Sequence, residues 1–194
     1  MTSHFRPAAV LLLVLTLLCG AVYPLLVTGI GRVAFPEQAA GSLVFDAGKL
    51  RGSRLIGQPF SSPRYVLGRP SATAPMPYNA AGSSGSNQGP LNPALVDAVK
   101  GRIAALRAAD PGNGAPVPVD LVTASASGLD PDISSAGALY QAGRVARARG
   151  VSRSAVEDLV RSHTEQPFLG FLGEARVNVL GLNLALDTAF PGRQ

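Results

Sequence analysis

The sequence predicts an α+β protein, in which a single N-terminal transmembrane helix is followed by one small mixed α/β extramembrane domain. Three observations support this. An uncharged apolar run lies near the N-terminus, the remainder has the length of one globular domain, and helical spacings there outnumber short strand-like segments. The expected parts are a short tail at 1–6, a transmembrane helix at 7–32 and a soluble domain at 33–194.

The apolar run extends from Pro7 to Gly31 without a charge. A helix of about 24 residues rises about 36 Å, enough to cross roughly 30 Å of hydrocarbon. A cleaved signal peptide has an apolar core of only about 7–15 residues, whereas this run continues past Gly20. A lipoprotein anchor at Cys19 is disfavoured because the preceding Leu18 is not small. We therefore expect a permanent single span.

Pro24 lies inside the predicted span, where it frees the carbonyl four residues earlier and can kink the helix. Because lipid cannot satisfy that carbonyl, Pro24 favours a neighbouring transmembrane helix. The alternative is that Pro24 lies at the interface beside Tyr23, which would then act as an aromatic belt anchor.

Charge gives an expectation for orientation and excludes one class of partner. Arg6 and the amino terminus favour a cytoplasmic N-terminus, although Arg32 and Lys49 on the other side oppose it. We expect a cytoplasmic N-terminus and an extracytoplasmic domain. The basic residues are scattered, aromatic content is 6% and Trp is absent, which argues against nucleic-acid binding. The single Cys offers no disulfide framework.

Two short strands are expected to open the soluble domain, at 41–46 and 53–57, with the Gly-containing segment 47–52 as their connection. The segment 59–93 is then a long loop rich in Pro, Gly, Ser and Asn. A loop of this length inside a compact domain is usually disordered or functional. Two interpretations stay open: a flexible surface loop, or a surface that docks against a partner.

Helices dominate the remainder. Asn92 and Pro93 fit the N-cap and first position of a helix that ends at 110–114. The β-branched segment 117–124 predicts a strand, near an edge because Pro118 lacks an amide proton.

Three further helical segments follow, which leaves few strands in the domain. They are a helix from Ser134 or Ser135 to Arg149 that ends at Gly150, a helix from the capping box Ser154–Glu157 to His163, and a tail at 176–187 that alternates and then shifts to helical spacing.

Motifs for catalysis are missing. The sequence has no phosphate-binding Gly-Lys loop, no paired His for zinc and no Gly-x-Ser-x-Gly elbow. Asp130 and Asp132 could hold a cation, but an Asx-turn is the favoured interpretation. A serine triad can be drawn from Ser125 or Ser127 with His163 and Asp120, as any Ser-rich chain with a His permits.

Four arginines cluster along the chain. A solvated helix face is the expected role, with anion binding as the alternative, for Arg144, Arg147, Arg149 and Arg153. No catalytic and no metal-binding residue is therefore predicted.

Ordered strings of residues span nearly the whole chain. They include Tyr23-Pro-Leu-Leu26, Gly52-Ser-Arg-Leu-Ile-Gly-Gln-Pro-Phe60, Met76-Pro-Tyr-Asn79, Asp120-Leu-Val-Thr-Ala-Ser-Ala-Ser-Gly-Leu-Asp130, Gly170-Phe-Leu-Gly173 and Asn183-Leu-Ala-Leu-Asp187. Together these strings resemble the C subunit of the Kdp-type potassium-transporting ATPase. The departures are small: Ser84 stands where that family usually has a second Gly, and Asp132 where it often has His or Asn.

The resemblance implies an accessory subunit of an ATP-driven potassium uptake complex in the bacterial plasma membrane. Its partners would be a channel-like potassium-binding subunit and a P-type subunit that hydrolyses ATP. The family is described as a catalytic chaperone that raises the ATP affinity of the hydrolysing subunit, and a proposed nucleotide contact carries over to Gln141. An extracytoplasmic domain could not reach cytoplasmic ATP and would instead cap the ion entrance.

We expect no tightly bound cofactor; ATP would be shared with the hydrolysing subunit, and potassium would be the transported ion. Partner contacts are predicted at Tyr23, Pro24, Arg69, Tyr78, Asn79, Ser86 and Asn87. Two other functions stay open: a membrane-anchored extracytoplasmic serine hydrolase that uses the triad above, and a solute-binding module.

Overall fold

A computed structural model describes residues 4–191, which form two compact units that meet at Leu43 and Val44. The N-terminal unit is a continuous helix built from α1 (Phe5–Leu17), a π-helical segment η2 (Leu18–Val22) and α2 (Tyr23–Ala34), followed by the short helix α3 (Pro36–Ala39). Phe5–Ala34 is 30 residues long and apolar enough to cross a membrane, and none of its most apolar stretch is buried. It contains the whole span expected from the sequence.

Pro24 determines the backbone pattern of that helix. The Tyr23 amide donates to the Leu18 carbonyl, five residues back, and this bond closes the π-helical segment immediately before the proline. Pro24 has no amide proton to donate to the carbonyl four residues back, and the π-helical segment lies where that bond is missing. The helix thus departs from the regular α-helical ladder directly before Pro24, and the expected kink stays a prediction.

A hairpin of β1 (Leu43–Asp46) and β2 (Lys49–Ser53) follows, and the second unit begins at Val44, within β1. The expected second strand at 53–57 was placed too late. Ala47 and Gly48 both have positive φ, of 48° and 75°, so two residues complete the turn and β2 starts at Lys49.

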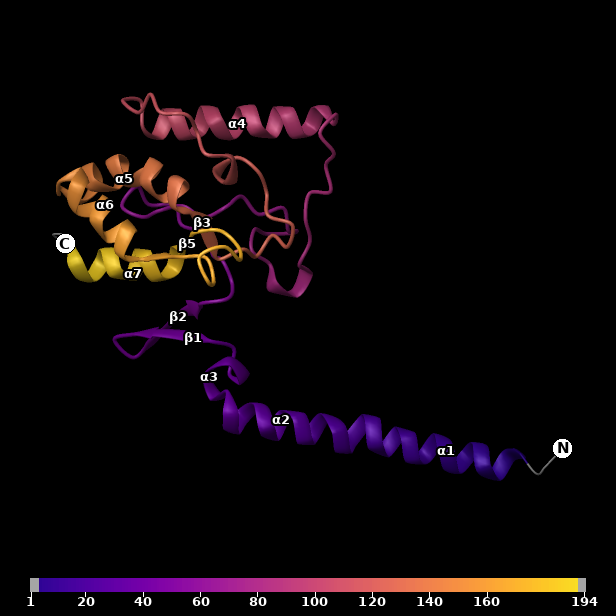
Figure 1. The fold of residues 1–194 in the computed structure, drawn as a ribbon. Helices are drawn as coiled ribbons and strands as arrows, with labels where there is room; N and C mark the ends of the chain where they lie inside the picture. Colours follow the sequence, from indigo (N-terminus) through magenta and orange to yellow (C-terminus); the bar gives the residue numbers. More distant parts are fainter. Residues whose placement is uncertain (1–3, 192–194) are drawn as a thin grey trace. The chain divides into compact units, whose positions relative to one another are not determined.

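Three helices and a small sheet form the core of this unit. The helices are α5 (Ser135–Arg149), α6 (Arg153–Ser162) and α7 (Val179–Ala189), which lie together in Figure 1. The antiparallel sheet has the order β3 (Asp132–Ser134), β5 (Arg176–Asn178) and β4 (Thr164–Glu165). Central Val177 faces Ile133 on one side and Thr164 on the other.

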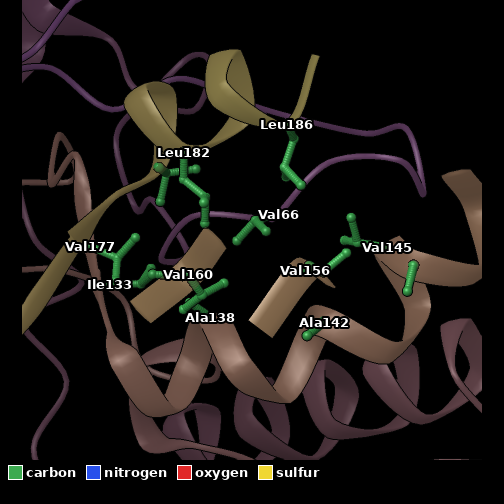
Figure 2. Close-up of a cluster of buried hydrophobic side chains, with 12 residues drawn as sticks. Val66, Ile133, Ala138, Ala142, Val145, Val156, Val160, Val177, Leu182 and Leu186 are labelled. Atoms are coloured by element: carbon green, nitrogen blue, oxygen red, sulfur yellow. The ribbon is translucent and has the colours of Figure 1, made fainter. Parts of the chain in front are cut away.

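The buried core brings distant parts of the chain together. In Figure 2, Leu182 and Leu186 of α7 point toward Val66, while Ala138 and Ala142 of α5 lie on the opposite side. Val66, Leu182 and Leu186 are completely buried. Val66 belongs to the long segment 59–93, which before Pro93 has no regular structure apart from the 3₁₀ turn η3 (Ala80–Gly82). That segment is therefore packed into the core in part, and a free surface loop does not describe it.

Helix ends follow the local signals in most places. Ser134 accepts a hydrogen bond from the Gly137 amide and caps α5, which ends at the left-handed Gly150 as expected. The cap of α6 was placed two residues late. The hydroxyl of Ser152 accepts from the Ala155 amide, and Ser154 lies inside the helix.

The region before α5 departs most from expectation. α4 (Pro93–Ala109) begins at the expected cap Asn92, yet it buries none of its residues, so its apolar face is only partly covered. The expected strand at 117–124 is wrong. It contains the 3₁₀ turn η4 (Val119–Leu121), and the Thr123 hydroxyl donates to the Val119 carbonyl, which closes the turn.

Candidate functional site

A single extended stretch of the segment 59–93 crosses the domain between α5 and α7 without a strand beside it. Two buried side-chain amides replace the missing strand. Asn183 accepts from the Val66 amide at 2.8 Å and donates to the Val66 carbonyl at 2.9 Å. Gln141 does the same for Leu67, at 2.9 and 3.1 Å. We call Gln141 and Asn183 the amide bracket.

Gln141, the predicted nucleotide contact, has no free hydrogen-bonding capacity. Besides its two bonds to Leu67, its Nε2 donates to the Gly137 carbonyl, and its Oε1 accepts from Arg144 at 2.8 Å. The residue is 2% exposed. A nucleotide at this position would have to displace bonds that hold the domain together, and the nucleotide role stays a prediction.

Two of the four arginines expected on a solvated helix face are buried. Arg144 donates to the carbonyls of Pro63 and Tyr65, and burial lowers the pKa of its guanidinium from the usual value. The Arg149 side chain has no exposed surface; it lies over the Tyr65 ring and donates to the Arg64 carbonyl. These guanidinium groups supply donors to carbonyls that no strand satisfies.

The other two arginines do lie at the surface, as expected. The Arg147 side chain is 63% exposed and pairs with Asp110, and the Arg153 side chain is 67% exposed and pairs with Glu157.

Two irregular segments, 68–87 and 125–130, join through their backbones and form what we call the paired-loop surface. Ser125 donates its amide to the Pro70 carbonyl, and Ser84 donates its amide to the Ser127 carbonyl. The Ser71 hydroxyl bonds the Gly128 carbonyl at 2.7 Å. These contacts fix most of the predicted partner-contact loop against the domain.

Gly128 makes this close approach possible. Its φ is +67°, and an added Cβ would lie 2.5 Å from the Thr73 methyl carbon and 2.8 Å from the Ser84 carbonyl oxygen. Only glycine fits this backbone conformation and this spacing without strain.

Three of the predicted partner contacts are tied into this surface. Arg69 pairs with Asp130 at 3.0 Å, and the Tyr78 hydroxyl donates to the Arg69 carbonyl at 2.5 Å. Burial is the main reason that the pKa of Tyr78 is raised, which keeps its phenol a neutral donor. Asn79 donates to the Ala74 carbonyl and caps η3.

The other four predicted contacts are not tied into this framework. Ser86 and Asn87 are exposed at the end of the paired-loop surface, whereas Tyr23 and Pro24 lie in the N-terminal helix. The structure thus joins Arg69, Tyr78 and Asn79 in one framework and leaves Ser86 and Asn87 free to meet solvent or a partner.

Beside this framework is a cavity of about 280 Å³, whose charged lining residues are Arg69, Asp120, Asp130, Asp132, Glu174 and Arg176. The expected Asx-turn is confirmed, since Asp130 Oδ1 accepts from the Asp132 amide. Asp132 pairs with Arg176, yet desolvation dominates and raises the pKa of Asp132. Within residues 4–191 no group of three His, Cys, Asp or Glu could hold a metal ion.

The alternative serine triad is not assembled among the described residues. His163 contacts the Leu159 carbonyl and Ser162, and the Ser127 hydroxyl accepts from the Leu129 amide. Asp120 accepts from the Ser134 amide, near the start of α5. No hydrogen bond joins His163 to Ser125, Ser127 or Asp120 within residues 4–191.

Comparison with known proteins then identifies the family. The model of the family KdpC, K+-transporting ATPase c chain, matches residues 5–188. The potassium-transporting ATPase KdpC subunit of Herminiimonas arsenicoxydans is 65% identical over 187 residues, which cover 96% of this chain and 98% of that protein. The subunit of the same name from Methylococcus capsulatus is 66% identical over 187 residues, with the same coverage. That from Variovorax paradoxus is 64% identical over 193 residues and covers 100% of both chains. The chain therefore belongs to the KdpC family of potassium-transporting ATPase subunits.

Proposed function

We propose that this chain is an accessory, non-catalytic subunit that stabilises a potassium-transporting ATPase through contacts with a channel-like subunit and an ATP-hydrolysing subunit. Membership of the KdpC family makes it a potassium-transport subunit, and its one long apolar helix makes it a single-pass membrane protein. The observation that carries the proposal is the domain's use of its polar residues. Gln141, Asn183 and Arg144 are committed to internal bonds, so contact with other subunits is the function that remains for the surface.

In this proposal the N-terminus lies in the cytoplasm and the soluble domain lies outside the cell membrane. There the paired-loop surface caps the ion entrance. The exposed end of that surface carries Ser83, Ser86 and Asn87, which offer hydroxyl and amide oxygens without charge. Neutral oxygens can contact potassium during passage without holding it tightly.

A thiol-labelling experiment tests this orientation. Ser86→Cys in a Cys19→Ser background should react with a membrane-impermeant maleimide in intact cells, because Ser86 is exposed. His4→Cys, in the N-terminal tail, is the matched control and should react only after the cells are permeabilised. Labelling at residue 4 but not at 86 in intact cells would place the domain in the cytoplasm and end the cap proposal.

A second experiment tests the accessory role. Replacing residues 7–32 with an unrelated apolar helix should release the chain from a purified complex, because the span and Pro24 would contribute to assembly. Retention at full stoichiometry would show that the native helix does not carry the assembly.

The chaperone role is the second candidate, in which Gln141 touches the nucleotide and raises ATP affinity. The chaperone role requires the domain to lie in the cytoplasm, and it requires Gln141 to break its bonds to Leu67. Gln141→Glu keeps the shape of the side chain and its acceptor but removes the two bonds that Nε2 donates to Leu67 and Gly137. A selective rise in the KM for ATP, measured at a temperature where the domain stays folded, would favour this role. A lower melting temperature with an unchanged KM would favour the structural role.

A further inference from the structure

An exposed apolar hairpin lies between β4 and β5, and nothing in the functions above uses it. Its four large side chains are 72%, 69%, 72% and 51% exposed, in the order Phe168, Leu169, Phe171 and Leu172. We call these four residues the apolar tip. Large apolar groups gathered this closely at a surface are a mark of an interaction site.

The tip is held in a defined conformation. Phe168 and Leu172 exchange both backbone hydrogen bonds, at 3.0 and 2.9 Å, and form a bridge. Leu169 and Gly170 turn the chain at φ values of 55° and 79°. A non-glycine residue in the left-handed region is unfavourable, so Leu169 lowers the local stability of the turn. The side chains are thus presented outward by a closed turn.

The charges that border the tip indicate which kind of partner fits. Glu165 and Glu174 flank the hairpin, and both are exposed. Arg176 pairs with Glu165 and Asp132, whereas Glu174 makes no ion pair among residues 4–191. The border therefore carries excess negative charge, which an anionic lipid surface repels and a basic protein surface attracts.

We propose that the apolar tip inserts into an apolar crevice bordered by Lys or Arg on another subunit of the same potassium-transporting ATPase. The inference rests on the proposed accessory role. Two independent features carry it: the outward presentation of four apolar side chains and the acidic border at Glu174. The contact lies outside the interface residues expected from the sequence, so it adds a second docking point to the soluble domain.

Photo-crosslinking in the intact complex tests this contact. The full chain carries p-benzoyl-phenylalanine in place of Phe168 or Phe171 and is co-expressed with the other subunits in membranes. Irradiation should join it to a subunit of the same complex, identified by mass spectrometry. The same photoreactive residue at Leu91, which is 95% exposed, or at Val119, which is 70% exposed, is the matched control and should give little product.

Substitution gives an independent readout. Phe168→Ser with Phe171→Ser should weaken retention of the chain in the purified complex by about tenfold or more, since two large apolar contacts are lost. Leu91→Ser with Val119→Ser should leave it unchanged. Glu174→Lys should weaken retention at low salt, whereas Asp97→Lys on α4 should not. All these positions are exposed, so domain melting should match that of the native chain.

The outcomes separate the two proposals. Crosslinks to lipid alone, or no crosslink from a chain that does co-purify, would overturn the tip contact and leave the accessory role intact. Unchanged retention of the double Phe variant would do the same. A native chain that does not co-purify with the other subunits would overturn both proposals.

Discussion

The amide bracket makes a strong prediction about stability. Asn183→Leu replaces a buried amide with an apolar side chain of similar size and removes both of its bonds to Val66. Asn183 is 1% exposed and Val66 is fully buried, so neither backbone group of Val66 can turn to water. Each buried backbone group left without a partner costs about 1–3 kcal/mol, and the pair therefore costs about 4 kcal/mol. That is a large share of the roughly 5–15 kcal/mol that stabilises a whole domain.

Thermal unfolding of the full chain in detergent, followed by circular dichroism at 222 nm, measures this cost. A loss of about 4 kcal/mol lowers the melting temperature of a chain of this size by about 8–16 °C. Gln166→Leu is the matched control, because Gln166 is exposed and should change the free energy of unfolding by less than about 0.5 kcal/mol. A melting temperature for Asn183→Leu within about 2 °C of the native value would refute the reasoning, since the orphaned groups alone predict a larger loss.

Two further predictions concern the paired-loop surface and its charged neighbour. Gly128→Ala should lower the melting temperature and increase protease cleavage within 82–90, because the new methyl group would overlap Thr73 and Ser84 and strain a positive φ. Asp132→Asn should raise the free energy of unfolding at neutral pH, and it should reduce the change of that free energy with pH just above pH 3.8. Melting curves from pH 3 to 7 measure both effects. The sign follows because burial raises the folded-state pKa of Asp132, so the contribution of its protonated form is lost as pH rises through that value. Unchanged pH dependence in Asp132→Asn would contradict this.

The sequence was a good guide wherever structure depends on neighbouring residues. Asn92 before Pro93, and Ser134 and Gly150 around α5, place caps through bonds that span two to four residues. The apolar run at 7–32 likewise needs no distant partner to form a helix. Local competition explains one miss: Ser152 and Ser154 can both cap a helix, and the earlier serine does so.

The amide bracket was missed because no local pattern marks it. Gln141 lies 74 positions from Leu67, and Asn183 lies 117 positions from Val66. A comparable distance in sequence hid the burial of Arg144, whose two carbonyl acceptors belong to the segment 59–93. Spacing along a helix shows which side chains share a face, but it does not show whether another segment covers that face.

Contacts with residues distant in the sequence also outweighed the strand propensity of the β-branched segment 117–124. Asp120 accepts the Ser134 amide and so lies beside the start of α5, which requires a turn at this point in the chain. The apolar tip escaped notice for a related reason. Phe168 and Phe171 look like core residues in a sequence, and only their exposure in the folded chain identifies them as surface groups.

The amide bracket also bears on how the polypeptide is made. Ribosomes release a chain from its N-terminus, so the Val66 peptide emerges long before α7, which supplies Asn183 and ends at Ala189. Val66 therefore has to wait, unattached and accessible to proteases or chaperones, until α7 has been synthesised. Nascent chains that stop before α7 would lack Asn183, and Val66 would then have no partner for its backbone groups. Cellular quality control could recognise such chains by this unattached segment.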